Sequence, residues 1–116
     1  MSQPFDNNQY RATILRHVDA DTTHCRVNLG ADVSVNMTVR WAGIDAPERN
    51  TAEGKAATAA VNEWLPVGSR CNLQTTEDRR EKFGRYLGTF TVDGVNLNQR
   101  LIDEGHAVPY DGGRRT

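Results

Sequence analysis

The clearest pattern of apolar and polar positions lies between residues 33 and 41. Val33, Val35, Met37, Val39 and Trp41 alternate there with polar side chains. This alternation is expected of a strand with one buried face. The same period places Arg40 on the face opposite the apolar row.

Two further strands are predicted before this one. Residues 10–18 carry Ile14, Leu15 and Val18 among β-tolerant neighbours, which favours a first strand. The turn-type segment 19–22 follows, and from residue 23 apolar and polar positions alternate again through residue 29. Residues 29–32, which include a glycine and an aspartate, then predict a hairpin connection to the strand at 33–41.

The period becomes helical after residue 56. Ala57, Ala60, Val61, Trp64 and Leu65 recur at the spacing of one amphipathic stripe. A proline and a glycine at positions 66 and 68 end this helix.

The remaining chain predicts two more strands and a second helix. Residues 70–77 and 85–92 favour strands, and an Asp-Gly pair turns the chain after the second of them. Asn96 can cap the second helix, with Gln99 three residues later and Gly105 at its end.

The predicted order is therefore three strands, a helix, two strands and a helix. This order fits a β-rich α+β fold, a five-stranded Greek-key barrel of the OB type, because closure removes the exposed edges of so short a sheet. We expect the domain to span residues 10–110, with a flexible arm at 1–9 and a flexible tail at 111–116.

Composition narrows the classes of function. The chain has 116 residues and a formal net charge of −1, so contact with nucleic acid must depend on locally placed cations rather than on an overall basic field. We find neither a membrane-spanning stretch nor the pattern of a signal peptide. We therefore expect a soluble monomer without a membrane partner, cytoplasmic rather than secreted.

Cysteine and histidine spacing does not favour a zinc site. Cys25 and Cys71 are far apart in the sequence and are expected to be free and buried, with a single bridge as the alternative. His17, His24 and His106 lack ligand spacing and are expected to be solvated or hydrogen-bonded.

Acidic residues lie in two of the predicted turns. If the second and third strands form a hairpin, the start of one lies beside the end of the other, which brings Asp21 near Asp45. Two carboxylates held together favour a cation between them, and an all-oxygen set suits calcium or magnesium. The alternative for residues 19–22 is an Asx-type turn bonded to its own backbone.

Two arginines could complement these acids. Arg85 follows Lys82-Phe83-Gly84, and a guanidinium brought near Arg40 would make a multi-donor clamp for phosphate. A solvated turn charge is the alternative for Arg85. Carboxylates for a metal together with arginines for an anion are what phosphodiester cleavage requires.

In combination, these motifs resemble the staphylococcal nuclease (thermonuclease) family. The resemblance runs from about residue 14 to residue 107 and rests on five segments in the family's order: Asp19-Ala20-Asp21-Thr22, Val39-Arg40-Trp41-Ala42-Gly43-Ile44-Asp45-Ala46-Pro47-Glu48, Glu53-Gly54-Lys55-Ala56-Ala57, Lys82-Phe83-Gly84-Arg85-Tyr86-Leu87 and Asp93-Gly94-Val95-Asn96-Leu97-Asn98. It implies an OB-fold barrel and calcium-dependent hydrolysis of DNA or RNA, preferably single-stranded.

The resemblance also implies roles for particular residues. One calcium ion would be held by Asp21, Asp45 and the backbone carbonyl of Ala46, with Asp19 as a nearby outer acid. Glu48 matches the general base that acts on water. Arg40 and Arg85 match the phosphate-binding arginines, while Lys82 and Tyr110 match positions that contact substrate.

Three positions depart from the family pattern. Ala46 replaces a threonine, which leaves a main-chain ligand intact. Ala20 stands where glycine is frequent, so strain is expected if that residue needs a positive φ. The third C-terminal helix of the best-known member is missing from this sequence. The alternative to a nuclease is a catalytically silent OB-fold module that binds single-stranded nucleic acid or a protein partner.

Overall fold

The computed structural model describes residues 9–77 and 86–110. Its elements, in chain order, are β1 (Gln9–Asp19), β2 (Thr22–Gly30), β3 (Val33–Trp41), β4 (Ile44–Asp45), α1 (Ala52–Trp64), β5 (Arg70–Glu77), β6 (Tyr86–Val92), β7 (Val95–Asn96), α2 (Leu97–Asp103) and β8 (Val108–Pro109). The predicted flexible arm, apart from Gln9, and the predicted flexible tail lie outside the described residues.

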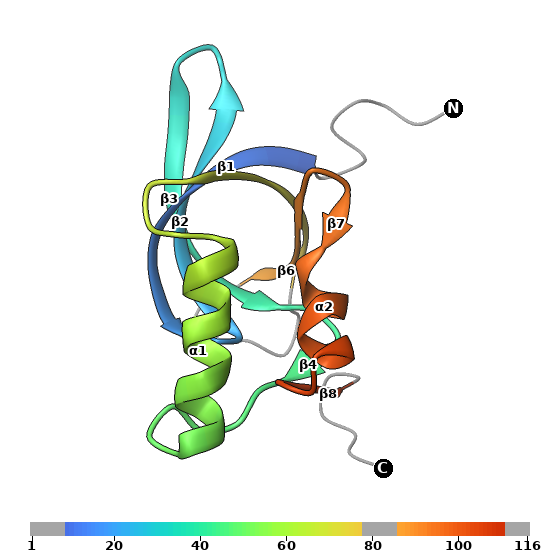
Figure 1. Ribbon diagram of the computed structural model, residues 1–116. Helices are drawn as coiled ribbons and strands as arrows, with labels where there is room; N and C mark the ends of the chain where they lie inside the picture. The colour runs from blue at the N-terminus through green and yellow to red at the C-terminus, as the bar shows by residue number, and fades with distance from the viewer. Residues whose placement is uncertain (1–8, 78–85, 111–116) are drawn as a thin grey trace, which may run out of the picture.

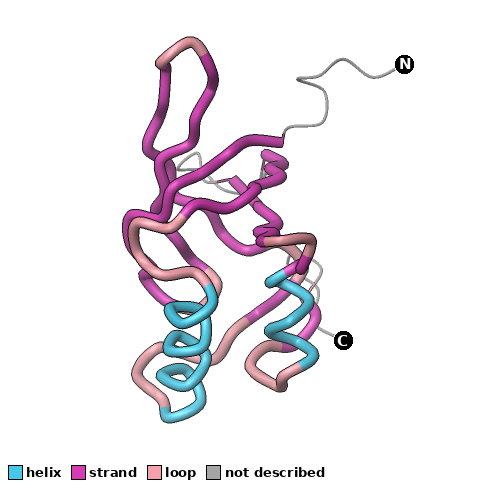
Figure 2. The backbone as a smooth tube through the Cα atoms, turned by 45° about the horizontal axis from the view of Figure 1, so that its top comes forward, coloured by secondary structure: helices cyan, strands magenta, loops and turns pink. Residues whose placement is uncertain are grey.

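Five long strands form a closed mixed barrel. The sheet order is β3-β2-β1-β5-β6, with the short β7 beyond β6, and a parallel pairing of β3 with β6 closes it. Both helices lie at the end of the barrel opposite the tip of the β2–β3 hairpin (Figures 1 and 2). The prediction of a five-stranded OB-type barrel with two helices is confirmed.

The core fills the inside of the barrel and the space beneath α1. Trp41 and Phe90 are fully buried and stack with their ring centroids 4.3 Å apart. Each such side chain contributes about 1.5–3 kcal/mol through burial. The predicted buried face of β3 is present only at the end of the strand, where Val39 and Trp41 are buried. Val33 and Val35 are 54% and 40% exposed, because the hairpin projects beyond the rest of the barrel (Figure 1).

The helix boundaries follow from capping side chains. The hydroxyl of Thr51 accepts from the N–H of Gly54 at the start of α1. Asn96 accepts from the N–H of Gln99 at the start of α2, which is the predicted cap. Both contacts satisfy amide groups that have no partner within the helix.

The short strands β4, β7 and β8 were not predicted, since two-residue strands carry no alternation. The strain considered for Ala20 does not arise. In the described part of the chain the non-glycine residues with positive φ are Ala31, Asp32 and Asp93, and Ala20 is buried at the β1–β2 turn. None of the described helices is long and apolar enough to cross a membrane.

Candidate active site

The turn between β1 and β2 holds the carboxylate of Asp21 in a fixed position. The Asp21 side chain is 9% exposed, and its Oδ2 atom accepts from the N–H of Ala46 at 3.1 Å. Its main-chain carbonyl accepts from the N–H of Trp41 at 2.9 Å. The turn is thereby tied both to the end of β3 and to the segment after β4.

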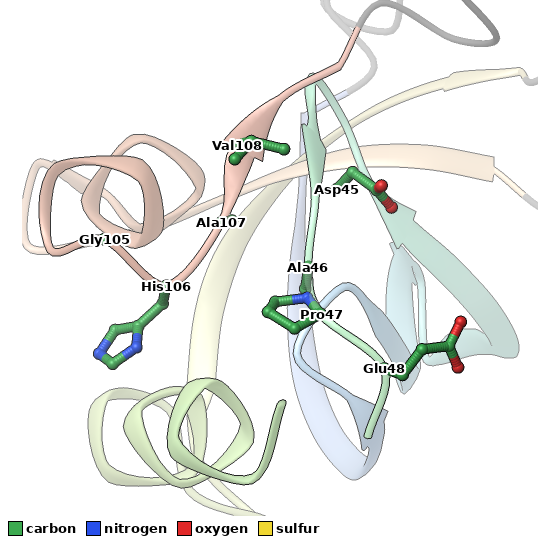
Figure 3. Close-up of a pocket in the computed structure, with 8 residues that line it drawn as sticks. All are labelled: Asp45, Ala46, Pro47, Glu48, Gly105, His106, Ala107 and Val108. Carbon is green, nitrogen blue, oxygen red and sulfur yellow. The ribbon is translucent and has the colours of Figure 1, made fainter. Parts of the chain in front are cut away.

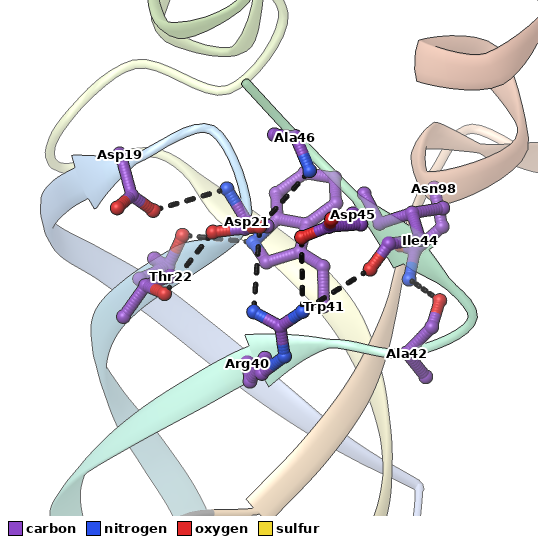
Figure 4. A network of polar contacts seen from close by, with 11 residues as sticks. Asp19, Asp21, Thr22, Arg40, Trp41, Ala42, Ile44, Asp45, Ala46 and Asn98 are labelled. Atoms are coloured by element: carbon purple, nitrogen blue, oxygen red, sulfur yellow. Dashed lines mark hydrogen bonds and ion pairs between the residues drawn. The ribbon is translucent and has the colours of Figure 1, made fainter. Parts of the chain in front are cut away.

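Strand pairing brings Arg40 to the same place. Thr22 at the start of β2 pairs with Arg40 near the end of β3, so the hairpin geometry expected from the sequence is present. One guanidinium nitrogen of Arg40 lies 3.3 Å from Asp21 Oδ2, and another lies 3.5 Å from Asp45 Oδ1. Arg40 therefore bridges the two carboxylates that were predicted to share a metal (Figure 4).

A second small sheet positions Asp45. In this sheet β4 pairs with β8, so that Asp45 lies opposite Val108 and Ile44 lies opposite Pro109. The N–H of Tyr110 donates to the carbonyl of Gly43 at 2.9 Å. The chain near residue 110 thus fixes the segment that carries Asp45.

Burial and neighbouring groups shift the pKa values of the two acids of the β1–β2 turn in opposite directions. Burial raises the pKa of Asp19 to about 6, and the adjacent Asp21 acts in the same direction. For Asp21 burial alone would raise the pKa, but contacts with Asp19, the N–H of Ala46 and Arg40 together hold that pKa below its ordinary value. Asp21 loses its proton more readily than Asp19, so it is the better cation ligand.

Glu48 is exposed and lies three residues after Asp45. It lines a cavity of about 450 Å³ together with Asp45, Ala46, Pro47 and residues 105–108. The carboxylates of Asp45 and Glu48 lie on one side of the chain segment that carries them, and the imidazole of His106 lies on the other side (Figure 3). Glu48 can therefore approach a molecule bound at Asp45, whereas His106 does not belong to the carboxylate group.

The N-terminus of α1 holds the backbone at Glu48. The carbonyl of Glu48 accepts from the hydroxyl of Thr51 at 2.7 Å and from the N–H of Thr51 at 3.0 Å. A Cβ atom placed on Gly54 would lie 1.7 Å from that carbonyl oxygen. Only glycine allows the first turn of α1 to pack so closely against the loop.

Sequence reasoning did not identify the role of Asn98. This side chain is buried, donates to the carbonyls of Ala42 and Gly88 at 3.0 and 2.9 Å, and accepts from the N–H of Phe90 at 3.0 Å. It ties α2 to β6 and to the loop that leads to Asp45. A polar residue in the apolar stripe of α2 was the available signal, since buried amides form hydrogen bonds.

Of the remaining predicted site residues, the structure describes only Tyr110. The Tyr110 ring lies under the guanidinium of Arg40, with the carbon of that group 5.6 Å from the ring centroid. Lys82 and Arg85 lie outside the described residues. β6 begins at Tyr86, which pairs with Val39, so the described chain resumes beside the end of β3.

A comparison with known families decides the assignment. The sequence model of the family described as staphylococcal nuclease homologue matches residues 38–115. This match covers more than half of the chain. The chain belongs to the staphylococcal nuclease homologue family. The matched range contains Arg40, Asp45 and Glu48 but begins after Asp21.

Three relatives have low sequence identity to this chain, and each of them is longer than it. The SPbeta prophage-derived endonuclease YokF of Bacillus subtilis (strain 168) is 33% identical over 82% of the chain and 32% of its own length. Endonuclease YncB of the same strain is 30% identical over 90% of the chain and 51% of its own length. Succinoglycan biosynthesis protein ExoI of Rhizobium meliloti (strain 1021) is 31% identical over 81% of the chain and 49% of its own length. The chain thus spans about a third to about half of the length of these relatives.

The oxygen donors of the site fit a hard divalent cation in their chemistry. Asp21 and Asp45 supply carboxylates without nitrogen or sulfur ligands beside them, as calcium prefers. Among residues 9–77 and 86–110, no group of three or more His, Cys, Asp or Glu side chains could hold a metal. A cation here would therefore need main-chain and water oxygens in addition to these two acids.

Proposed function

We propose that this member of the staphylococcal nuclease homologue family is a nuclease that hydrolyses phosphodiester bonds of DNA or RNA. The observation that carries the proposal is the convergence of the Asp21 and Asp45 carboxylates on one guanidinium, with Glu48 lining the same cavity as Asp45. The endonuclease names of two relatives support it. The chain spans only part of each relative, so the activity of the whole relatives is a proposal for this chain.

We assign the cation site to the carboxylates of Asp21 and Asp45, with the backbone carbonyl of Ala46 as a third protein ligand. The N–H of Ala46 already contacts Asp21, which keeps this main-chain segment next to the acid. A bound calcium ion would polarise a phosphate oxygen and neutralise charge that develops during attack. Asp19 would support Asp21 from the outer side of the turn.

The other residues would act on water and on phosphate. Glu48 would accept a proton from the water that attacks phosphorus in line with the leaving oxygen. Arg40, together with Arg85, would donate to the non-bridging oxygens. Tyr110 would contact substrate beside Arg40, and Lys82 would bind a further phosphate.

Replacing Glu48 by Gln tests the role in proton transfer. We expect the rate of cleavage of a labelled single-stranded oligonucleotide to fall by about 10²- to 10⁴-fold, since the amide cannot accept the proton. Glu53→Gln is the matched control, because Glu53 is an exposed acid in the first turn of α1. A rate unchanged by Glu48→Gln and by chelation of divalent ions would contradict the mechanism.

The same assay separates the nuclease from a silent binding module. Calcium-dependent cleavage supports the proposal, and retained binding without cleavage at any calcium concentration identifies the module instead. Parallel reactions with DNA and RNA of one sequence establish substrate preference. The monomeric state and the cytoplasmic location stay predictions, to be checked by light scattering and by localisation of a labelled chain.

A further inference from the structure

Three exposed arginines lie together on the outer face of the barrel, away from the candidate active site. Arg26 of β2 and Arg70 of β5 both pair with Thr13 of β1. Paired residues of antiparallel strands project to the same side of a sheet. Since adjacent strands are about 4.8 Å apart, the two arginine Cα atoms are roughly 10 Å apart. Arg11, two residues before Thr13, projects from the same face.

These side chains line one surface groove. The groove has a volume of about 320 Å³ and is lined by Arg11, Thr13, Arg26 and Arg70 together with Asn28, Asp32, Val33 and Ser34. Asp32 is the one acid in this lining, so the groove carries an excess of positive charge. The whole chain has a formal net charge of −1, so the positive side chains of the groove are a local cluster and not part of an overall basic surface.

The three guanidiniums are available to a ligand. All three residues are exposed, and in the part of the chain that the structure describes none of them forms an ion pair with a carboxylate. By contrast, Arg40 lies against two carboxylates and Arg100 against Glu104. Unpaired guanidiniums with hydroxyl and amide donors beside them suit the oxygens of phosphate groups.

The groove is continuous with the face that carries Arg40. On β3 the residues Ser34, Asn36, Thr38 and Arg40 all lie on the side opposite the apolar row, and Thr22 and Arg26 share that side on β2 through their pairing with Arg40 and Asn36. Arg26 lies four positions after Thr22, a length of about 14 Å along the strand. His24 and Thr38, joined by a hydrogen bond of 2.7 Å, occupy the interval.

We propose that this groove binds the phosphodiester backbone of a single-stranded nucleic acid whose cleaved bond lies at Arg40. The inference rests on the proposed function for the location of that bond. Nucleic acid is favoured over an acidic peptide because the polar face connects the groove to a second anion-binding group. OB folds contact about 4–16 nucleotides of single-stranded substrate, so a strand near the upper end of that range can reach both places.

Fluorescence anisotropy with labelled oligonucleotides in chelator tests the groove without cleavage. The full chain is compared with the triple variant Arg11→Gln, Arg26→Gln and Arg70→Gln. We expect the slope of log affinity against log salt to become about 2 smaller in magnitude for an oligonucleotide of about twelve nucleotides, because each phosphate contact on a single strand contributes about 0.7. For about four nucleotides, too short to reach the groove from Arg40, the change in slope should be smaller.

Two further proteins serve as controls. Lys55→Gln removes an exposed positive charge on α1 and should leave the slope unchanged. The triple Arg→Lys variant keeps the charge and should retain most of the slope, which separates lost phosphate contacts from a damaged fold. Thermal melting of every variant checks folding independently.

The outcomes distinguish the groove from the catalytic site. If the triple Arg→Gln variant keeps the wild-type slope while the wild-type chain cleaves, the proposed role of the groove is wrong. The proposed nuclease activity is then unaffected. If the triple Arg→Gln variant has a reduced slope but the wild-type chain does not cleave, the groove binds nucleic acid and the proposed nuclease activity is wrong. Displacement of the long oligonucleotide by polyglutamate at a much lower concentration than by unlabelled DNA of equal charge would identify an acidic-protein site and overturn the inference.

Discussion

Arg40 occupies the position between two carboxylates that a cation would also favour. It lies 3.3 Å from Asp21 and 3.5 Å from Asp45, and its side chain is only 21% exposed. The guanidinium therefore reduces the repulsion between the two acids before any metal binds. A cation that binds both acids must compete with Arg40, and a displaced guanidinium would be free to contact phosphate.

Replacement of Arg40 by Met should reveal this competition. We expect the variant to lose about 1–3 kcal/mol in the free energy of unfolding without metal, because two carboxylates then lack a charged hydrogen-bond partner. Added calcium should raise its melting temperature more than it raises that of the wild-type chain. Urea unfolding and thermal melting, with and without calcium, measure both effects.

A matched control for this experiment is Arg49→Met, since Arg49 is an exposed arginine on the same loop as Glu48. Its stability and calcium response should remain close to those of the wild-type chain. Equal calcium responses in the Arg40 variant and the wild-type chain would contradict the competition.

His17 links three elements through its two ring nitrogens. Trp41 donates to the hydroxyl oxygen of Thr23 at 2.9 Å, so that hydroxyl can donate its own hydrogen to Nδ1 of His17 at 2.9 Å. Nε2 of His17 then donates to the carbonyl of Leu65 at 2.7 Å. This arrangement requires a neutral imidazole, and sequence analysis predicted only that the histidine would be solvated or hydrogen-bonded.

Acid should therefore destabilise the fold through His17. Burial lowers the pKa of His17, although the hydrogen bond to Leu65 acts in the opposite direction. Because the folded pKa lies below the ordinary value of 6.5, the unfolded chain binds the proton more readily. Stability from this group is present above pH 6.5 and is lost as the pH falls through the folded pKa.

Urea unfolding at pH 7.5 and pH 5 checks the sign. The wild-type chain should lose more stability on acidification than His17→Gln, whose amide can still donate to Leu65 but does not titrate. An equal loss in both chains would assign the acid sensitivity to other groups, with Asp19 and Asp21 as the first to examine.

At the scale of elements, α1 determines where Glu48 lies. The first turn of α1 binds the carbonyl of Glu48 through Thr51, and Gly54 packs against the same carbonyl. The proline and acids before α1 predicted a turn that approaches a helix. They did not predict that the helix holds the main chain of the proposed general base.

Gly54→Ala should thus behave unlike an ordinary substitution in a helix. Alanine in place of glycine normally stabilises a helix by about 0.5–1 kcal/mol. Here the new methyl group would lie 1.7 Å from the Glu48 carbonyl oxygen and 2.5 Å from its carbon, so backbone must move. We expect lower stability and a reduced cleavage rate, measured by urea unfolding and by oligonucleotide cleavage.

The control is Ala56→Gly, which alters an exposed position of the same helix. That variant should lose about 0.5–1 kcal/mol and retain the cleavage rate. A stabilised Gly54→Ala chain with full activity would show that α1 does not constrain Glu48.

Some elements could be predicted because one local pattern fixes each of them. Alternation in residues 33–41 placed Arg40 outside the core, and the cap at Asn96 located the start of α2. The pairing of β4 with β8 depends on residues more than sixty positions apart, and a two-residue strand has no period. For the same reason the groove of Arg11, Arg26 and Arg70 was not foreseen, since it forms only when β1 pairs with both β2 and β5.

At the scale of the whole molecule, barrel closure connects the site to global stability. Strand β3 pairs with β2 on one side and with β6 on the other, while the Trp41–Phe90 stack lies inside. Arg40 pairs with Thr22, next to Asp21, through the β2–β3 hairpin and with Leu87 through the β3–β6 pairing that closes the barrel. Opening the barrel should therefore disrupt the site and expose the core in one step.

The two cysteines provide a probe of that opening. Both are buried and free, as sequence analysis predicted. Burial raises the pKa of Cys25 to about 11, and burial together with the neighbouring Cys25 raises the pKa of Cys71 to about 12. Because the thiolate is the reactive form, neither side chain should react with a thiol reagent at pH 8 while the barrel is closed.

We expect both thiols to be labelled at one common rate that increases with urea in proportion to the unfolded fraction. Cys25 and Cys71 lie on β2 and β5, on either side of β1, so equal rates require the three strands to separate together. Mass spectrometry of the labelled chain measures the two rates, and the fully unfolded chain supplies the unprotected reference. Labelling of one cysteine well before the other in native buffer would mean that the barrel opens strand by strand, and the site could then be lost without global unfolding.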